Sequence, residues 1–246
     1  MDRNKEIKKL GLLFYTAGRF EGLKADAGST IEFVESDNPI LMPSRNDIAI
    51  IRDMKSAWYA MDKHDKISVS TYMKAHGNMV ASTNVPNPGH LRERPVQVSF
   101  GSGLRMWLAE YPSVNEELFS QKISEAISGD DNYKQKAARL FGNIAKLQPF
   151  PDGNKRTALL VANRLLIPDN EVMLIPYDDS DYQLFMLQLE SFYRNEMTLD
   201  EFGAAFSRNI VDVDNLEITK PFGRIVNLTA QTRTYRELNT NPEFRR

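Results

Sequence analysis

The sequence predicts an all-α protein, a bundle of helices with one small β-hairpin and a C-terminal extension. Apolar residues recur at helical spacing over most of the chain between residues 3 and 209. The period changes to two only near residues 96–108, and beyond residue 211 the chain becomes more polar and weakly patterned. With 246 residues, of which 41% are hydrophobic, the chain is long enough to bury one sizeable core.

Eight segments carry the helical pattern. They are 3–24, 46–62, 67–79, 113–129, 133–147, 157–167, 180–195 and 198–209. A polar connection that ends at Pro39 and Pro43 joins the first two. The segment 157–167 is apolar on most sides, so we expect it to be the buried centre of the domain, ended by Pro168. Three helix starts show a hydroxyl residue followed three positions later by Glu or Gln. These predicted capping boxes are Ser113 with Glu116, Ser180 with Gln183, and Thr198 with Glu201.

The β-structure is predicted from alternation of apolar and polar residues. Residues 96–100 alternate, the glycines within 101–103 offer a turn, and alternation resumes over 104–108. This pattern predicts a hairpin in an otherwise helical chain. A short strand is also predicted at 225–228, within the C-terminal extension.

Composition narrows the class of protein. The formal net charge is -2, which argues against a dedicated nucleic-acid binder. The absence of cysteine excludes disulfides and thiolate metal sites. The apolar run at 10–14 is too short for a signal or membrane segment, so we expect a soluble cytoplasmic protein, with delivery by a secretion system left open. His64, His76 and His90 have no metal-ligand spacing and are predicted to be surface or turn residues.

The segment 148–157 carries the chemistry. Gly153 lets the backbone turn sharply, and the free N–H groups of the following helix favour an anion. Lys155 and Arg156 add positive charge, and an arginine can hold phosphate oxygens with two hydrogen bonds. Asn154 has an amide that can donate to a phosphate oxygen. Asp152 is suited to Mg²⁺, which binds one or two carboxylates together with substrate phosphates.

A plainer explanation fits part of this pattern. Asp152, Gly153 and Asn154 are common turn residues, and for those three alone an ordinary turn is the better interpretation. Lys155 and Arg156 change the balance, because cations at a helix N-terminus oppose the helix dipole. Two of them there make more sense if an anion binds.

The longer run resembles the signature of the Fic/Doc (fido) family, His-x-Phe-x-(Asp/Glu)-(Gly/Ala)-Asn-(Gly/Lys)-Arg, often with a further Arg three residues on. The matching residues are 148–156, flanked by similar residues at 137–141 and 163–166. Residues 89–98 also resemble the family's segment that leads into its "flap" hairpin. The resemblance extends over about residues 10–210, and it implies a Fic-type helical bundle at 46–210. An N-terminal helix and connection at 1–45 would precede this core, and an extension at 211–246 would follow it.

The resemblance implies a protein that binds ATP and Mg²⁺ and transfers AMP to a Ser, Thr or Tyr hydroxyl of a target protein. Asp152 would hold the metal, and Gly153, Asn154 and Lys155 would cradle the phosphates. Arg156 would contact the phosphates and stabilise the transition state. The hairpin at about 94–108 would dock an extended target segment by strand addition. No nucleic-acid or membrane partner is implied, an oligomer is compatible, and a toxin–antitoxin-like role is one setting for such a protein.

Two departures from the family pattern bear on activity. The catalytic base of the family is His, and here the position holds Gln148. A carboxamide cannot accept the hydroxyl proton, and losing a general base typically costs about 10²- to 10⁴-fold in rate. The substitution fits a pseudoenzyme, an unusual transferase or an inactivated toxic protein. Leu159 stands where the further Arg is expected, and with Lys155 this matches Doc-like members, which transfer phosphate.

Many family members carry an inhibitory helix with the pattern (Ser/Thr)-x-x-x-Glu-(Gly/Asn), whose Glu pairs with the second motif Arg. Residues 17–22 give the nearest match, with Glu21 as the acid and Ala17 in place of the hydroxyl residue. Glu32 is a looser second candidate. Because Leu159 replaces the second Arg, either Glu would lack its usual partner. A solvated Glu before a glycine helix stop explains the pattern at least as well.

Three hypotheses follow. The first is a Fic-type AMP transferase scaffold impaired at Gln148. The second is Doc-like phosphotransfer to a protein hydroxyl. The third is a non-catalytic module that captures partners on the hairpin or through residues 211–246.

Overall fold

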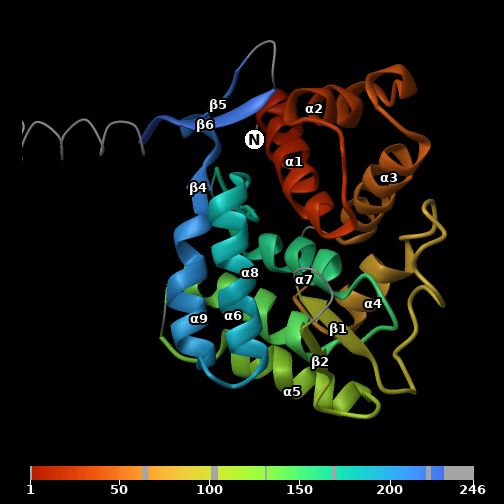
Figure 1. Cartoon of the computed structure of the whole chain (residues 1–246), viewed down its shortest axis with the longest axis vertical. Helices are drawn as coiled ribbons and strands as arrows, with labels where there is room; N and C mark the ends of the chain where they lie inside the picture. Colours follow the sequence, from red (N-terminus) through yellow and green to blue (C-terminus); the bar gives the residue numbers. More distant parts are fainter. Residues whose placement is uncertain are drawn as a thin grey trace, which may run out of the picture.

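Helices form most of the computed structural model, which describes residues 2–62, 66–100, 105–130, 132–167, 170–219 and 223–229 (Figure 1). The helices are α1 Arg3–Gly18, α2 Ala27–Ser36, α3 Arg45–Ala60, α4 Val69–Gly77, α5 Glu116–Ile127, α6 Tyr133–Leu147, α7 Asn154–Ala162, α8 Asp179–Tyr193 and α9 Leu199–Phe206. Short 3₁₀ segments are η1 Arg19–Glu21, η2 Pro39–Leu41, η3 Asn163–Leu166, η4 Ser207–Asn209 and η5 Val213–Asn215. The predicted all-α class is confirmed.

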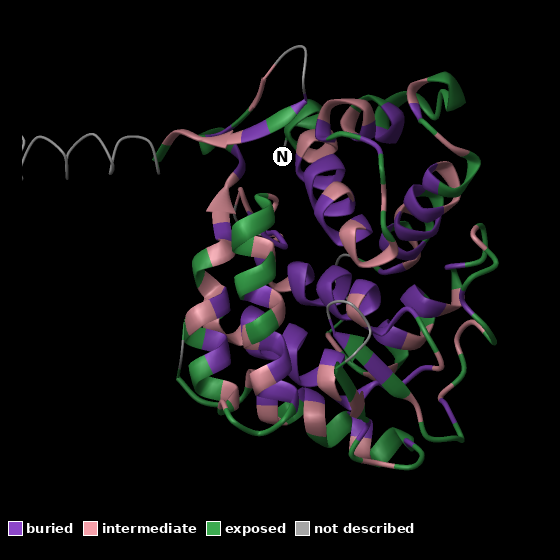
Figure 2. Cartoon of the chain, viewed as in Figure 1, coloured by how far each residue is buried: buried purple, intermediate pink, exposed green. Residues whose placement is uncertain are grey.

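Helix α7 is the buried centre of the bundle, as the sequence predicts. Its residues from Arg156 to Ala162 are buried, and it contacts α1, α3, α4 and α6 (Figure 2). The helix begins at Asn154, three residues earlier than the apolar pattern indicates, and it continues as η3. Pro168, the predicted stop, lies outside the described residues.

Helix α6 lies between α5 and α9, against a cluster of phenylalanines. The ring centroids of Phe141 and Phe206 are 4.9 Å apart, and those of Phe192 and Phe202 are 4.8 Å apart. One hydrophobic core runs through the chain from Leu10 to Ile225. Helices α1 and α2 share this core with the rest of the protein, and the boundaries that we place at residues 45 and 210 stay predictions.

The predicted hairpin is present. Strands β1 Gln97–Phe100 and β2 Arg105–Leu108 pair antiparallel with Val98 opposite Trp107, while the predicted turn at 101–103 and Leu104 lie outside the described residues. The strand predicted near 225 is β6 Arg224–Asn227, which pairs with β5 Leu216–Thr219.

The pair of β3 Glu171–Met173 with β4 Ile210–Asp212 was not predicted. Each of these two strands has only three residues, which is too short for alternation to be recognised.

Helix α2 stands where the sequence suggested a polar connection. Asp26 caps it by accepting a hydrogen bond from the Ser29 N–H group at 2.9 Å, and Thr30, Phe33 and Val34 are buried. Ten residues give only one short apolar stripe, which the polar residues on the other face obscured.

Two predicted caps are also wrong. Asn115, two residues after Ser113, caps α5, and Asp178, two residues before Ser180, caps α8. Each is the residue directly before the first helical one, where a side-chain oxygen can accept from the N–H groups of the first turn. The capping box of Thr198 is confirmed. Within the described ranges, no helix combines the length and apolar character needed to cross a membrane.

Gly11 sets the distance between α1 and α2. A Cβ atom added there would lie 2.7 Å from the Cα atom of Ile31, so the α2 backbone would have to shift. We expect Gly11→Ala to lower the free energy of unfolding by roughly 2 kcal/mol, the usual scale of overpacking, although Ala is the better helix former. Urea denaturation measures this.

The matched control is Gly77→Ala, where an added Cβ would meet the nearest atom, the Cα of Gly89, at an ordinary 3.4 Å. It should leave stability unchanged or slightly raised. Equal stabilities for the two variants would contradict the close packing of α1 on α2.

Candidate functional site

The segment 148–153 joins α6 to α7, and one buried amide fixes its shape. Gln148 and Gly153 adopt left-handed backbone conformations with φ values of 52° and 74°. The Asn154 side chain accepts from the Phe150 N–H group at 2.8 Å. It also donates to the Phe150 carbonyl at 2.9 Å and to the Gln148 Oε1 atom at 3.0 Å. The Asn154 amide therefore closes this loop, and what it leaves for a ligand is the backbone N–H group of the first turn of α7.

Gln148 is turned into the protein, with 6% of its surface exposed. Its Nε2 atom donates to the Ala145 carbonyl at 2.5 Å, and its Oε1 atom accepts from Asn154. The side chain thus supports the end of α6 and the start of α7. It supplies no group that can accept a proton near neutral pH.

Arg92 holds the same loop from the other side, and sequence reasoning did not single it out as a functional residue. Its guanidinium is buried and donates to the carbonyls of Gln148 at 2.5 Å and Leu147 at 3.4 Å. It also donates to the carbonyls of Tyr111 at 2.8 Å and Pro112 at 2.9 Å, beyond the end of β2. Arg92 therefore links the motif loop to the base of the hairpin.

The hairpin is also fastened to α8. Arg105 of β2 forms an ion pair with Glu190 at 3.1 Å, and Arg194 donates to the Met106 carbonyl at 3.2 Å. The buried ring of Tyr193 packs against Trp107 with a centroid distance of 4.8 Å. These contacts fasten the hairpin to the C-terminal end of α8 and leave the Met106 and Leu108 side chains exposed.

A cavity of about 220 Å³ opens at the amino end of α7. It is lined by Phe20, Glu21, Gln148, Asp152, Gly153, Asn154 and Lys155. The exposed Asp152 carboxylate accepts from the Gly153 N–H group at 2.6 Å, which keeps it at the helix start. The unsatisfied N–H groups of this turn favour an anion. The cavity therefore combines an anion site with one carboxylate.

Arg156 follows the cavity residue Lys155 in α7 and has only 1% of its surface exposed. Its Nε atom is 3.0 Å from the Glu21 Oε1 atom, and its Nη1 atom is 4.0 Å from the Asp53 Oδ2 atom. Neither ion pair has the N–H···O geometry of a hydrogen bond. Within the described residues, no guanidinium nitrogen of Arg156 therefore donates a hydrogen bond. A buried cation with unused donors has capacity for a further anionic ligand.

The partner of Glu21 corrects the sequence interpretation. We expected Glu21 to lack its usual partner because Leu159 replaces the second motif Arg, and a solvated Glu explained the pattern at least as well. Instead Glu21, at the end of η1, pairs with the first motif Arg, Arg156, while Leu159 is buried in the core. The second candidate, Glu32, lies exposed on α2.

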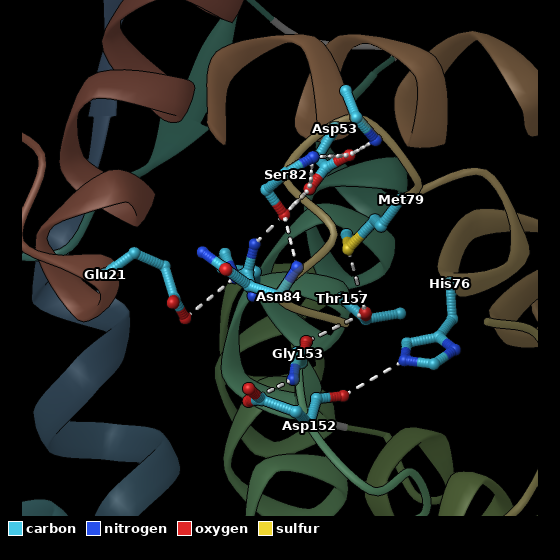
Figure 3. A network of polar contacts seen from close by, with 11 residues as sticks. Glu21, Asp53, His76, Met79, Ser82, Asn84, Asp152, Gly153 and Thr157 are labelled. Carbon is cyan, nitrogen blue, oxygen red and sulfur yellow. Dashed lines mark hydrogen bonds and ion pairs between the residues drawn. The ribbon is translucent and has the colours of Figure 1, made fainter. Parts of the chain in front are cut away.

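Asp53 of α3 is the second carboxylate beside Arg156, and sequence reasoning did not identify it. It is fully buried and accepts from the Ala81 N–H group at 2.5 Å and from the Ser82 N–H and hydroxyl groups (Figure 3). Asp53 thus joins α3, the loop after α4 and the central helix. The pairing of positions 53 and 156 depends on tertiary packing, which no local pattern reveals.

The charged side chains of the cavity have shifted pKa values. Burial raises the pKa of Glu21, although Arg156 opposes the shift. Burial also lowers the pKa of Lys155, whose ammonium lies 5.8 Å from the centroid of the Phe20 ring. In both groups burial disfavours the charged form. A bound phosphate or metal ion would change this electrostatic cost.

The structure corrects the prediction for His76, which is fully buried rather than at the surface. Its ring stacks on Phe150, with centroids 3.8 Å apart, and burial lowers its pKa to about 4. His90 is exposed, and its Nδ1 atom lies 3.0 Å from the Pro88 carbonyl oxygen. His64 lies outside the described residues. Neither described histidine lines the cavity to replace a base at position 148.

Comparison with known proteins assigns one segment of the chain to a family. A family model described as the Fic/DOC family matches residues 66–166. This segment is a Fic/DOC-family domain. The match includes the cavity residues of the motif loop and the hairpin, and it leaves out Glu21 and Asp53. No curated protein matches the chain.

Solved Fic structures share the fold. The chain matches a Fic family protein from Desulfovibrio desulfuricans with a TM-score of 0.62 and 14% identity, covering 87% of this chain and 66% of that one. A Fic domain containing signaling protein from Bacteroides thetaiotaomicron matches with a TM-score of 0.58 and 19% identity, covering 86% of this chain and 82% of that one. Fic-1 from C. elegans matches with a TM-score of 0.57 and 18% identity, covering 81% of this chain and 59% of that one. At these identities the likeness shows the fold alone.

The raised pKa of Glu21 gives a pH dependence with a definite sign. The folded protein holds the Glu21 proton more tightly than the unfolded chain, so this contribution to stability is present below the ordinary value of 4.5 and is lost as pH rises through the folded pKa. We expect the stability of the wild type relative to Glu21→Gln to fall across that window. Denaturation at several pH values measures this.

Glu32→Gln is the control, because the Glu32 side chain is exposed. If the wild type gained stability relative to Glu21→Gln as pH rose from about 4.5, attraction to Arg156 would outweigh burial, contrary to the pKa direction given above.

Proposed function

We propose that the chain binds ATP with Mg²⁺ and that its scaffold serves AMP transfer to a Ser, Thr or Tyr hydroxyl of a target protein. The observation that carries this proposal is the cavity at the amino end of α7 with the neighbouring Arg156, a buried cation whose nitrogens donate no hydrogen bond in the described chain. Backbone N–H groups, Lys155 and Arg156 are donors suited to phosphate oxygens. Membership of the Fic/DOC family supports the same ligand class.

Asp152 fits the metal. The described residues hold no group of three or more acids and histidines that could bind a metal by themselves. Mg²⁺ often takes only one or two carboxylates and completes its shell with phosphates and water, so one exposed carboxylate beside an anion site is sufficient. When bound there, Mg²⁺ would neutralise charge on the phosphates during transfer.

The chain's own residues support an in-line displacement. In a competent site, a base at position 148 would take the proton of the target hydroxyl as its oxygen forms a bond to the α-phosphorus. The bond from that phosphorus to the bridging oxygen then breaks, and pyrophosphate leaves. Lys155 and Arg156 would offset the charge that develops on the phosphates. Gln148 cannot take the proton, so we infer slow turnover by this chain.

The target is proposed to dock on the hairpin. Met106 and Leu108 of β2 are 46% and 57% exposed, so they are available to a bound segment, while Arg105 fixes the strand to α8. An extended peptide adding to such a strand gains main-chain hydrogen bonds. Arg92 connects the two regions, because it donates to the Gln148 carbonyl and to the carbonyl of Tyr111, just beyond the end of β2.

Glu21 is proposed to restrain nucleotide binding. Phosphate oxygens that reach Arg156 would compete with the Glu21 carboxylate, which is 3.0 Å from it. This extends the sequence hypothesis of an inhibitory Glu, with the first motif Arg as its partner in place of the missing second one.

Two alternatives remain as proposals. Doc-like transfer of the γ-phosphate is favoured by Leu159, which is fully buried and leaves the site without a second motif Arg. A non-catalytic partner-binding protein is favoured by Gln148, whose amide is used within the loop. The mass added to a target distinguishes AMP from phosphate, and partner capture that survives Asp152→Ala and Arg156→Ala would favour the binding module.

Replacing Gln148 by His tests the proposed activity directly. We expect Gln148→His to raise AMP labelling of target proteins from labelled ATP by about 10²- to 10⁴-fold, the range that a general base contributes. A lysate supplies the targets, and mass spectrometry identifies the added group.

The control for this experiment is Gln148→His combined with Asp152→Ala, which should remove the labelling because the metal ligand is lost. Robust labelling by the wild-type chain, or none by Gln148→His despite intact ATP binding, would contradict the proposal that position 148 alone limits the reaction.

Removing the Glu21 charge tests the restraint. We expect Glu21→Gln to bind ATP with Mg²⁺ about 10-fold more tightly than the wild type, which is within the usual range for coupling between two contacts. Titration calorimetry measures the affinity, with Glu32→Gln as the control. An unchanged or weaker affinity for Glu21→Gln would show that Glu21 does not compete with the nucleotide.

A further inference from the structure

His76 contacts the motif loop more extensively than its place on α4 suggests. The ring is fully buried, lies 3.8 Å from the Phe150 ring between centroids and is inclined to it by only 4°. Its Nε2 atom is 3.0 Å from the carbonyl oxygen of Asp152 (Figure 3). A Cβ atom added at Gly153 would lie 3.5 Å from the same nitrogen. His76 therefore contacts Phe150 and Asp152 and lies close to Gly153.

The hydrogen bonds settle which ring nitrogen carries the proton. The Nδ1 atom lies 2.8 Å from the Gly89 nitrogen, whose N–H group donates to it. Nδ1 is thus the acceptor, so the proton of the neutral ring is on Nε2, which donates to the Asp152 carbonyl. One imidazole bridges the loop before the hairpin and the loop before α7.

The consequence concerns Asp152, which has few other restraints. Its carboxylate is exposed, and among the described residues it accepts one hydrogen bond, from the adjacent Gly153 N–H group. Its carbonyl is held by His76, from a helix whose burial fixes the ring. Fixing the carbonyl limits rotation of the peptide unit between Asp152 and Gly153 and so limits where the carboxylate can lie.

We propose that His76 is a positioning residue for the Asp152 carboxylate, through the hydrogen bond from its Nε2 atom to the Asp152 carbonyl. His76 does not act on substrate, because it does not line the cavity and both its nitrogens are engaged. The role rests on the proposed function where it concerns Mg²⁺, while the bond itself is a property of the chain without ligand. A group that orients a metal ligand commonly changes metal affinity by about 10- to 100-fold when it is lost.

Two substitutions separate the two hydrogen bonds of the ring. In His76→Gln the amide nitrogen occupies the place of Nε2 and keeps the donor to Asp152. In His76→Asn the amide oxygen occupies the place of Nδ1 and keeps the acceptor for Gly89. Both lose the stacking on Phe150, and they differ in side-chain size by one methylene group.

The first measurement is the Mg²⁺ concentration that half-saturates ATP binding, followed by calorimetry. We expect His76→Asn to raise it about 10-fold and His76→Gln to stay within about threefold of the wild type. The second measurement, on the chain without ligand, is hydrogen exchange of the Gly153 amide, which should become faster in His76→Asn than in His76→Gln. Equal behaviour of the two variants in both measurements would overturn the proposal and leave His76 with a packing role.

The ¹⁵N spectrum of the wild-type His76 ring keeps the proposal testable if both variants unfold. We expect a proton on Nε2 and none on Nδ1 at neutral pH, and a ring protonated on Nδ1 alone would refute the bond to Asp152. If the wild type failed to bind ATP with Mg²⁺ while exchange and spectrum agreed with expectation, the proposed function would fail and the positioning role of His76 would stand.

Discussion

The site depends on one buried cation, Arg156 on the central helix α7. A guanidinium at 1% exposure is costly unless it is compensated, and here two carboxylates from distant segments approach it. Glu21 reaches it from η1, and Asp53 reaches it from α3 while also holding Ser82. Neither forms a well-aligned hydrogen bond with it, so the charge is balanced but its donors stay unused. The packing of three segments around α7 and the capacity to bind an anion therefore have the same origin.

The motif loop and the helices beside it could be predicted from sequence because their signals are local. The apolar stripe of α6, the turn at Gly153 and the capping box of Thr198 each lie within a few residues of the structure they specify. The partners of the loop could not be predicted in this way. Asp53 is more than 100 positions from Arg156. His76 lies on a short helix, and no local sequence pattern distinguishes this buried histidine from an exposed polar residue. Such contacts follow from tertiary packing, which one sequence without its structure does not display.

The proposed function separates binding from turnover. The proposed anion site consists of the start of α7 with Lys155, which line the cavity, and the neighbouring Arg156, and none of these needs a base at position 148. The buried Gln148 amide satisfies Ala145 and Asn154, so this substitution preserves the loop while leaving the hydroxyl proton without an acceptor. Arg92 extends the same support to the base of the hairpin, where the target is proposed to lie. Under the proposed function, such a scaffold would retain its ligand geometry while its chemistry is slowed.

The most direct measurement is a crystal structure of the chain with ATP and Mg²⁺. Our account predicts phosphate density on the N–H groups at the amino end of α7, a metal at the Asp152 carboxylate, and Glu21 displaced from Arg156. Density for the nucleotide elsewhere, for example in the separate cavity lined by Tyr15, Tyr177 and Tyr182, would contradict it. So would crystals grown at saturating nucleotide in which the cavity at α7 holds no phosphate and Glu21 still contacts Arg156.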